Sequence, residues 1–397
     1  MKNSLDISPR EDWRNGGFSI YVHWPFCAAK CPYCDFNSHT AISIEERIWL
    51  EAYTKEIDRV SRLTGPREVG SVFLGGGTPS LMSPGLVDGI LNKISRVWNV
   101  DQNCEITLEA NPTSVEANKF KGFKVAGINR VSMGIQSLND NDLKRLGRLH
   151  TAKEALASFE IARNVFENTT FDLIYARQNQ TIESWKNELK QALSLSLEHM
   201  SLYQLTIEPG TAFGEIYANG GLKGLPSDDY ASDLFDTTAL LCEAHGLPAY
   251  EVSNHARSGS ECRHNLNYWN YGDYAGIGPG AHGRLSLDGV RYSTEAYRQP
   301  DQWLQQVFKG CGDSLKTTLS DKDQGVEMVL MGMRMKQGIS LKRFSTFFGT
   351  QIKSNIIADL KEAGLIAVEA GRLRTTHRGT LVLNYVIKEI LPEVVVC

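Results

Sequence analysis

Short apolar runs alternate with amphipathic segments along the first half of the chain. Residues 18–24 are β-branched and aromatic, as is typical of a strand, and apolar positions then recur at helical spacing from Ile44 to Val60. The same order of strand and helix returns five times. The later predicted strands cover residues 71–74, 104–109, 129–136, 170–175 and 200–206. Six β-then-α units in succession predict a parallel sheet, either doubly wound or closed towards a barrel.

The predicted helices begin at recognisable caps. Ser43 with Glu46 and Thr151 with Glu154 match the capping box, in which a hydroxyl and a carboxylate cap the first turn together. In both parallel architectures, function lies at the carboxyl ends of the strands. The unusual residues of this half of the chain fall at or near those ends, so we expect one site there.

The second half of the chain does not continue the alternation of predicted strands and helices. Residues 209–230 are rich in Gly, Pro and Asp and predict a long connection, and residues 250–283 predict an ordered functional loop because they show little periodicity. Helices dominate from about residue 324, and a hairpin is predicted within residues 365–375, an order that resembles a winged helix. A net charge of about +3 over residues 321–397 is too weak to indicate a DNA-binding face, and it favours a small packing or docking unit. We expect a flexible tail over 1–16, a core over 17–285 and a C-terminal domain over 286–397.

Composition narrows the class of protein. The 397 residues are 42% hydrophobic, enough for a large core, and eight scattered cysteines favour a reducing compartment, so we expect a cytoplasmic protein. The N-terminus lacks the apolar region of a secretory signal, and no run approaches the roughly 20 apolar residues of a membrane span. The net charge of -4 gives no reason to expect nucleic acid as a partner, and it leaves a local peripheral membrane contact open.

Three cysteines form the sharpest chemical pattern. Cys27, Cys31 and Cys34 follow the first predicted strand at C-x3-C-x2-C spacing. Thiolates suit iron-sulfur clusters or zinc, and a structural zinc site takes four protein ligands, whereas a three-cysteine cluster leaves one iron open. A zinc loop completed by His23 or His39, or cysteines that only pack, are the alternatives.

These motifs together resemble the radical S-adenosylmethionine (SAM) superfamily. The resemblance rests on the cysteine loop, the Gly-Gly-Gly-Thr-Pro turn at residues 75–79, and polar residues at later strand ends. The oxygen-independent coproporphyrinogen III oxidase-like group is the most similar subfamily. Within it, residues 31–39 (CPYCDFNSH) and 264–269 (HNLNYW) resemble the HemW-type heme chaperone branch. The resemblance implies an α/β fold: a partial (β/α)6 TIM-like barrel with a small winged-helix-like α+β domain at the C-terminus.

The resemblance also implies site residues. Cys27, Cys31 and Cys34 would hold a [4Fe-4S] cluster whose open iron takes SAM. Arg148 suits the SAM carboxylate because its planar fork binds bidentately, and acidic residues suit ribose hydroxyls. The positions that match SAM-contacting residues of the family are Tyr21, Gly76, Gly77, Thr78, Glu109, Gln136, Arg148 and Asp172.

A second group of residues suits heme. His264 can act as an axial ligand, Tyr268 and Trp269 offer flat aromatic surfaces, and Cys262 is a competing ligand. The resemblance implies a carrier that binds heme as cargo and delivers it to acceptor hemoproteins such as respiratory enzymes.

Two rival functions stay open in the sequence. One is the oxygen-independent coproporphyrinogen III oxidase, although Phe36 stands where that enzyme has a further cysteine. The other is a zinc-stabilised interaction protein. The sequence also leaves open whether SAM is cleaved or only bound, and whether the chain forms oligomers.

Overall fold

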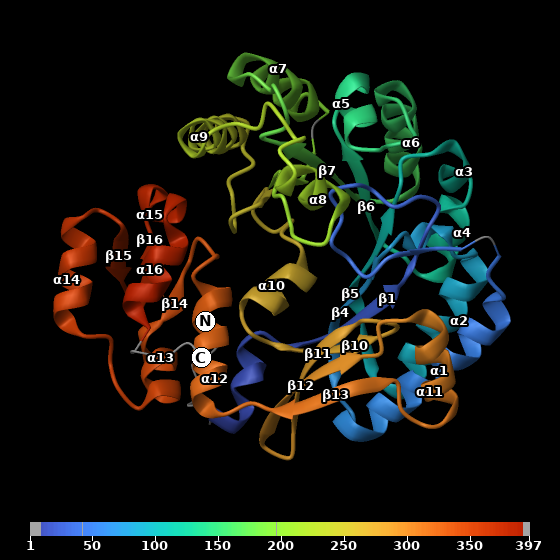
Figure 1. Cartoon of the computed structure of the whole chain (residues 1–397). Coiled ribbons are helices and arrows are strands. Elements are labelled where there is room, and N and C mark those ends of the chain that lie inside the picture. The colour runs from blue at the N-terminus through green and yellow to red at the C-terminus, as the bar shows by residue number, and fades with distance from the viewer. Residues whose placement is uncertain (1–8, 42, 196, 392–397) are drawn as a thin grey trace.

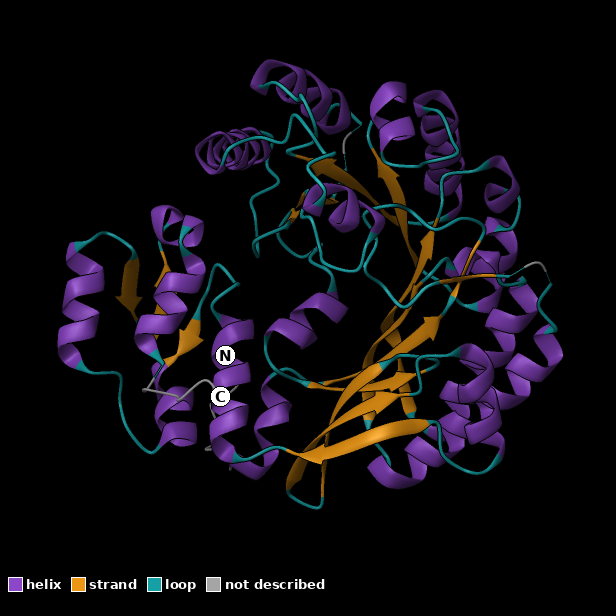
Figure 2. Cartoon of the chain, in the orientation of Figure 1, coloured by secondary structure: helices purple, strands orange, loops and turns teal. Residues whose placement is uncertain are grey.

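Six parallel strands form the centre of the protein, seen in a computed structural model that describes residues 9–41, 43–195 and 197–391. They are β1 (Phe18–Trp24), β4 (Glu68–Gly76), β5 (Asn99–Ala110), β6 (Arg130–Gln136), β7 (Asn168–Tyr175) and β8 (His199–Gln204). The sheet curves, and helices cover its outer side (Figures 1 and 2). The predicted α/β fold with a partial (β/α)6 barrel is confirmed.

Helices between the strands supply the outer layer. They are α1 (Glu46–Thr64), α2 (Pro84–Val97), α3 (Ser114–Ala117), α4 (Phe120–Ala126), α5 (Asp140–Arg145), α6 (Ala152–Val165), α7 (Ile182–Leu193) and α9 (Asp228–Ala244). The short helix α8 (Ala212–Ala218) instead packs Phe213 against Tyr33 of the cysteine loop. In β1, Ile20 and Val22 are fully buried in the main hydrophobic core, while Tyr21 between them is only half-buried. Successive strand residues point to opposite faces, so the inner face keeps the more polar set of side chains.

The sheet continues beyond the six parallel strands on both sides. At one edge β9 (Asn254–Ala256) pairs antiparallel with β8, and at the other β10 (Asp273–Ile277) pairs parallel with β1. Three antiparallel strands follow β10, namely β11 (His282–Leu287), β12 (Val290–Ala296) and β13 (Asp313–Thr318), with α11 (Pro300–Phe308) before the last. The expected domain boundary after residue 285 falls inside β11, and we propose that the C-terminal domain begins at about residue 319.

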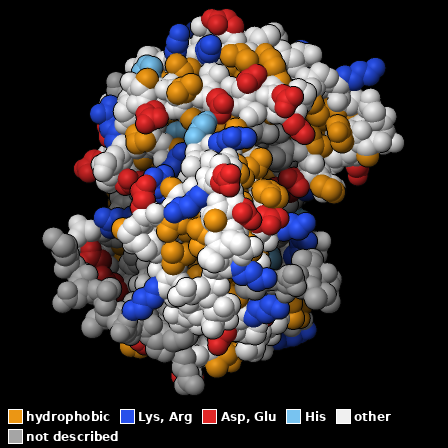
Figure 3. All heavy atoms as spheres, turned by 90° about the vertical axis from the view of Figure 1, so that its left-hand side faces the viewer, with side chains coloured by type: hydrophobic (Ala, Val, Ile, Leu, Met, Phe, Trp, Pro, Cys, Tyr) orange, Lys and Arg blue, Asp and Glu red, His pale blue; other side chains and the backbone are white. Residues whose placement is uncertain are grey.

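The C-terminal domain combines helices with a small sheet. Its elements are α12 (Asp321–Gly332), β14 (Ile339–Ser340), α13 (Leu341–Phe348), α14 (Ser354–Glu362), β15 (Ile366–Glu369), β16 (Arg372–Thr375), α15 (His377–Leu381) and α16 (Leu383–Ile390). The strands β15 and β16 form the predicted hairpin, and the domain has its own hydrophobic core. Seen from the side of this domain, basic and acidic side chains are interspersed (Figure 3).

Two expectations need correction. Residues 9–15, expected within a flexible tail, form a 3-10 helix (Pro9–Asn15), because Asp12 is buried and pairs with Arg343 at 2.6 Å; the remainder of that expectation, residues 1–8, lies outside the described residues. The span 250–283, expected as a loop, contains the helix α10 (Arg263–Trp269) as well as β9 and β10. No helix among the described residues is long and apolar enough to cross a membrane.

Candidate functional site

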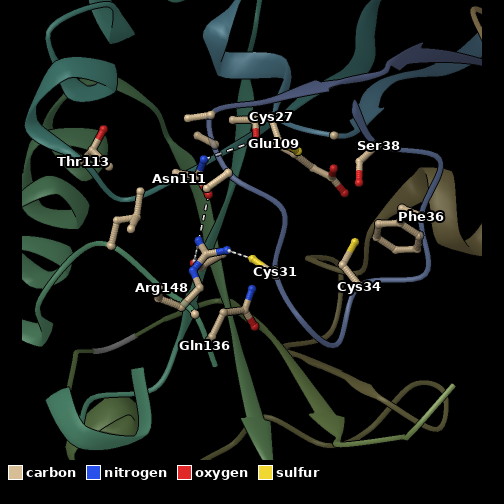
Figure 4. A pocket seen from close by; sticks show the side chains of 18 of the residues that line it. Cys27, Cys31, Cys34, Phe36, Ser38, Glu109, Asn111, Thr113, Gln136 and Arg148 are labelled. Atoms are coloured by element: carbon tan, nitrogen blue, oxygen red, sulfur yellow. Dashed lines mark hydrogen bonds between the residues drawn. The ribbon is translucent and has the colours of Figure 1, made fainter. Parts of the chain in front are cut away.

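A cavity of about 210 Å³ lies where the carboxyl ends of β4 to β7 meet the cysteine loop (Figure 4). All of the residues expected to bind the cluster or SAM, except Tyr21, line this cavity. They are Cys27, Cys31, Cys34, Gly76, Gly77, Thr78, Glu109, Gln136, Arg148 and Asp172. Residues more than 140 positions apart in the chain thus converge on one opening.

The three thiols of the loop lie half-buried at the edge of this cavity. Cys27 ends the short strand β2 (Phe26–Cys27), which pairs with β3 (His39–Thr40), and the turn between Cys31 and Cys34 closes with a backbone hydrogen bond of 3.2 Å. All three are free, and burial raises the pKa of the Cys27 and Cys34 thiols. Thiols in this state must lose their protons to bind a metal centre.

Hydrogen bonds connect two of the sulfurs through the cavity wall. The Thr78 hydroxyl donates to Cys27 Sγ at 3.4 Å, and the Asn111 amide donates to Thr78 Oγ1 at 3.3 Å. On the other side, Arg148 donates to Asn111 Oδ1 at 2.7 Å and to Cys31 Sγ at 3.4 Å. Donors aimed at sulfur stabilise thiolates, as an iron-sulfur cluster requires.

The zinc alternative lacks its fourth ligand. Both ring nitrogens of His23 are engaged, Nδ1 with the Tyr21 hydroxyl at 3.0 Å and Nε2 with the Asn37 carbonyl at 2.9 Å. His39 Nε2 lies 3.2 Å from Asn37 Oδ1. Among the described residues, no three His, Cys, Asp or Glu side chains lie close enough together to hold a single metal ion.

The glycine turn after β4 has a structural reason for its composition. Gly76 has a φ of 111°, and a Cβ there would lie 2.5 Å from the His23 ring; a Cβ on Gly77 would lie 2.7 Å from the Phe26 carbonyl oxygen. Only glycine lets this turn approach β1 and the cysteine loop so closely. The Gly76 N–H donates to Glu109 Oε2 at 3.2 Å, which fixes that carboxyl at the cavity.

Two carboxyl groups share the inner wall. Burial, with a further contribution from the charge of Asp172, raises the pKa of Glu109 to about 8, and burial raises the pKa of Asp172 to about 6. The Ser132 hydroxyl donates to Asp172 Oδ1 at 3.3 Å. Groups of this kind favour a ligand that brings positive charge or hydroxyl donors.

Arg148 and Gln136 occupy the wall opposite the glycine turn. Arg148 also donates to the Gly134 carbonyl at 2.8 Å, and its guanidinium lies between the cysteine loop and β6 (Figure 4). Gln136 ends β6 with a φ of 71°, in the left-handed region that a non-glycine residue adopts at a cost. A strained residue at the rim of a cavity is a common feature of ligand sites.

Tyr21 is near the cavity without lining it. Its hydroxyl is engaged with His23, and its ring stacks on Phe73 with centroids 6.3 Å apart. The aromatic stack continues to His264, whose ring centroid lies 4.8 Å from that of Phe73. The inner face of the sheet thus carries a row of rings that begins beneath the cysteine cavity.

His264 belongs to α10, which packs against β4 inside the curve of the sheet (Figure 1). Its Nδ1 lies 3.4 Å from the Ser71 hydroxyl, whereas Nε2 has no hydrogen-bond partner among the described residues. Burial lowers the pKa of His264 to about 4, so the imidazole is neutral at pH 7 and its Nε2 lone pair is free.

The other members of the expected heme group face different neighbours. Tyr268 and Trp269 pack on each other, Tyr268 also contacts Tyr274, and the Arg334 guanidinium lies 4.8 Å from the Trp269 ring centroid. Cys262 is buried and donates to Glu105 Oε1 at 3.3 Å, and burial raises the pKa of its thiol to about 12. Cys262 is therefore a protonated thiol, which is a poor heme ligand.

Sequence reasoning missed several cavity residues. Asn111 links Arg148 to Thr78, Ser132 supports Asp172, and Tyr33 and Glu116 also line the cavity. Asn111 comes soon after Glu109 at the end of a predicted strand, but it precedes a proline and so reads as a turn residue. Ser132 and Glu116 gave no signal, because hydroxyl and acidic residues are common in strands and helices.

This fold and this cavity define a protein of the radical SAM class. The family model of the radical SAM superfamily matches residues 21–192, and that of the HemN C-terminal domain matches residues 319–382. The chain belongs to the family of the HemW heme chaperones. It is 37% identical to heme chaperone HemW of Haemophilus influenzae over 389 residues, covering 94% of this chain and 98% of that protein.

Other relatives agree in length and identity. Heme chaperone HemW of Escherichia coli is 35% identical over 94% of this chain and 98% of its own length. The mitochondrial radical S-adenosyl methionine domain-containing protein 1 of Bos taurus is 35% identical over 94% of this chain and 87% of its own length. The solved structure of coproporphyrinogen III oxidase (HemN) from Escherichia coli superposes with a TM-score of 0.80 at 21% identity, covering 99% of this chain and 96% of that one, which shows a shared fold.

Proposed function

We propose that this protein is a heme chaperone, which binds heme and transfers it to acceptor hemoproteins such as respiratory enzymes. The observation that carries the proposal is the unpartnered Nε2 of His264, in a chain related over nearly its whole length to proteins named heme chaperones. A neutral imidazole with a free Nε2 is the form that ligates heme iron. The seven described cysteines are free, which favours action in a reducing compartment such as the cytoplasm.

The cavity at the strand ends would hold the two cofactors. Cys27, Cys31 and Cys34 would ligate a [4Fe-4S] cluster, which supplies an open iron for the amino and carboxylate groups of SAM. Arg148 offers a guanidinium to a carboxylate. Glu109, Asp172 and Gln136 would orient the ammonium and hydroxyl groups of SAM.

A heme titration followed by absorbance tests this assignment on the anaerobically reconstituted protein. His264→Ala is expected to lower heme affinity on the order of tenfold or more, about 1.4 kcal/mol, because iron loses its axial ligand. Cys262→Ala keeps the affinity of the native protein, since the thiol is protonated and engaged by Glu105. His245→Ala, at the exposed end of α9, is the matched control and leaves binding unchanged. Unchanged heme binding in His264→Ala would show that this ligand is wrong.

The rival enzymatic function has its own test. Phe36 lines the mouth of the cavity with 59% of its surface exposed, at the position where the oxidase has a further cysteine. Incubation of the cluster-loaded protein with coproporphyrinogen III, SAM and an electron donor without oxygen should return the substrate unchanged. Decarboxylated product would establish the oxidase in place of the carrier.

A further inference from the structure

Arg130 is a buried cation whose donors are unused. It is the first residue of β6, at the end of the strand that lies away from the cysteine loop, and only 5% of its surface is exposed. Its guanidinium makes no hydrogen bond to any described residue, and Nη2 is fully buried without a partner. A guanidinium has five N–H donors, and leaving them without acceptors in a protein interior is costly in free energy.

The nearest carboxylate does not satisfy these donors. Glu105 Oε2 lies 4.0 Å from Arg130 Nε, which is an ion pair beyond hydrogen-bond distance. The oxygens of Glu105 instead accept from the Cys262 thiol at 3.3 Å and from the backbone N–H groups of Arg263 and His264 at 3.2 Å each. The Glu105 carboxylate therefore accepts hydrogen bonds from the first residues of α10 and from Cys262, and it accepts none from Arg130.

Two other buried arginines each have at least one protein acceptor, while Arg177 Nε, Arg291 Nε and Arg291 Nη1 are buried without a partner. Arg177 donates to the Ile174 carbonyl at 2.7 Å and to Glu188. Arg291 donates to the carbonyls of Tyr271 at 3.1 Å and Gly272 at 2.8 Å. Arg130 alone among these three has no acceptor among the described residues.

A polar cavity of about 200 Å³ adjoins Arg130 at the amino ends of β6, β7 and β8. Its walls include Asn168, Thr169 and His199, with Arg163 at the rim. Two acids also line it, but Glu198 pairs with Arg257 at 3.5 Å and Glu167 is exposed. The volume exceeds that of several water molecules, which is enough for a carboxylate or phosphate group.

We propose that this cavity binds an oxyanion, with Arg130 as the anchoring residue. A carboxylate or phosphate supplies acceptors in the planar arrangement that a guanidinium fork binds best. The oxyanion has two sources: a propionate of the bound heme, which rests on the proposed function because His264 lies on the same inner face, or free inorganic phosphate. The proposal of an anion site itself does not depend on heme.

Thermal unfolding of the full-length protein in phosphate, against chloride at equal ionic strength, tests the first source. If phosphate is the ligand, it raises the Tm of the native protein and of Arg96→Met, an exposed arginine outside the cavity, and does not raise that of Arg130→Met. An equal rise in Arg130→Met would place phosphate elsewhere and rule out phosphate as the ligand of this cavity; together with equal binding of heme and its ester, it would overturn the site. Should Arg130→Met fail to fold, Arg130→Lys keeps the charge without the fork and is expected to weaken the phosphate effect.

Heme and heme dimethyl ester, titrated under the same conditions, test the second source. If a propionate is the ligand, the native protein binds heme on the order of tenfold more tightly than the ester, and Arg130→Met binds both alike. Native protein that responds to phosphate as it does to chloride, and that binds heme and ester equally, would refute the oxyanion site. Absence of all heme binding would refute the proposed function alone, because the phosphate comparison would still decide the site.

Discussion

At the scale of single residues, Glu109 makes the native protein sensitive to pH. Its folded-state pKa of about 8 lies above the 4.5 that is usual for a glutamate carboxyl, so the folded state holds the proton more tightly than the unfolded chain. The stability that the protonated carboxyl contributes is therefore present below about pH 4.5 and is lost as pH rises through about 8.

Glu109→Gln copies the protonated carboxyl at every pH. Without cofactors, this variant should exceed the native protein in free energy of unfolding by about 1–3 kcal/mol at about pH 8.5, and should nearly match it at about pH 5. Urea unfolding at the two pH values measures the difference. An equal gap at both values would mean that Glu109 has an ordinary pKa.

Gln136 combines a left-handed backbone with a place in the wall of the cysteine cavity. Gln136→Gly relieves the left-handed backbone and is expected to raise the free energy of unfolding by about 0.5–1 kcal/mol, because relief of strain exceeds the entropy that glycine adds to the unfolded chain. The same change removes a cavity side chain and should weaken SAM binding. Denaturant unfolding and SAM titration measure the two effects.

Asp288 gives the matched control for that variant. It has a φ of 51° in the exposed turn between β11 and β12, outside the cavity. Asp288→Gly should give a similar change in stability with no change in SAM affinity. Loss of SAM affinity in both variants, or in neither, would contradict a specific role for Gln136.

Sequence patterns identified most of the residues at the strand ends, because each lies at or near the end of a predicted strand. They could not identify Asn111 or Arg130 as special. Asn111 precedes a proline and reads as a turn residue, and Arg130 looks like any charged residue at the start of a strand. Their importance comes from partners more than 30 positions away or from the lack of a partner, which only three-dimensional packing reveals.

At the scale of elements, α10 joins the barrel to the C-terminal domain. The turn after it contributes Tyr271, whose hydroxyl donates to Glu327 on α12 at 2.8 Å, and Glu327 also accepts from Arg284 on β11 at 2.8 Å. Periodicity did not predict α10, because seven residues complete only two turns and show no repeat.

Glu327→Ala tests this attachment. Arg284 and Tyr271 would both lose their acceptor, and because the ion pair is only about 20% exposed the free energy of unfolding should fall by about 1–3 kcal/mol. We also expect weaker heme binding with unchanged iron content, since α10 loses its support and the cysteine loop does not. Heme titration and iron analysis separate the two effects.

Glu369→Ala is the control for that change. Glu369 pairs with Arg374 on the surface, with side chains 70% and 40% exposed, so its loss should change stability by at most about 0.5 kcal/mol. If heme affinity were the same in both variants, α10 would not depend on the C-terminal domain.

At the scale of the whole molecule, the strand and helix alternation predicted the six parallel strands and hence the edge where the cysteine cavity lies. The extension of the sheet through β11, β12 and β13 was not predicted. These strands have exposed or half-exposed residues at many positions and follow a loop-like segment, so they lack the apolar runs that marked the parallel strands. That omission also explains why the expected boundary fell inside β11.

The whole molecule places the cysteine cavity and α10 on one curved sheet, and the central claim of the proposed function is that heme is carried and handed on. The most direct test mixes the heme-loaded protein with an excess of an apo-cytochrome acceptor or, in parallel, with a protein that only scavenges free heme, and follows heme absorbance with time. Direct delivery predicts faster loss of heme to the acceptor than to the scavenger, with a rate that rises with acceptor concentration. Equal rates, independent of acceptor concentration, would mean that heme simply dissociates and would contradict the role of a chaperone.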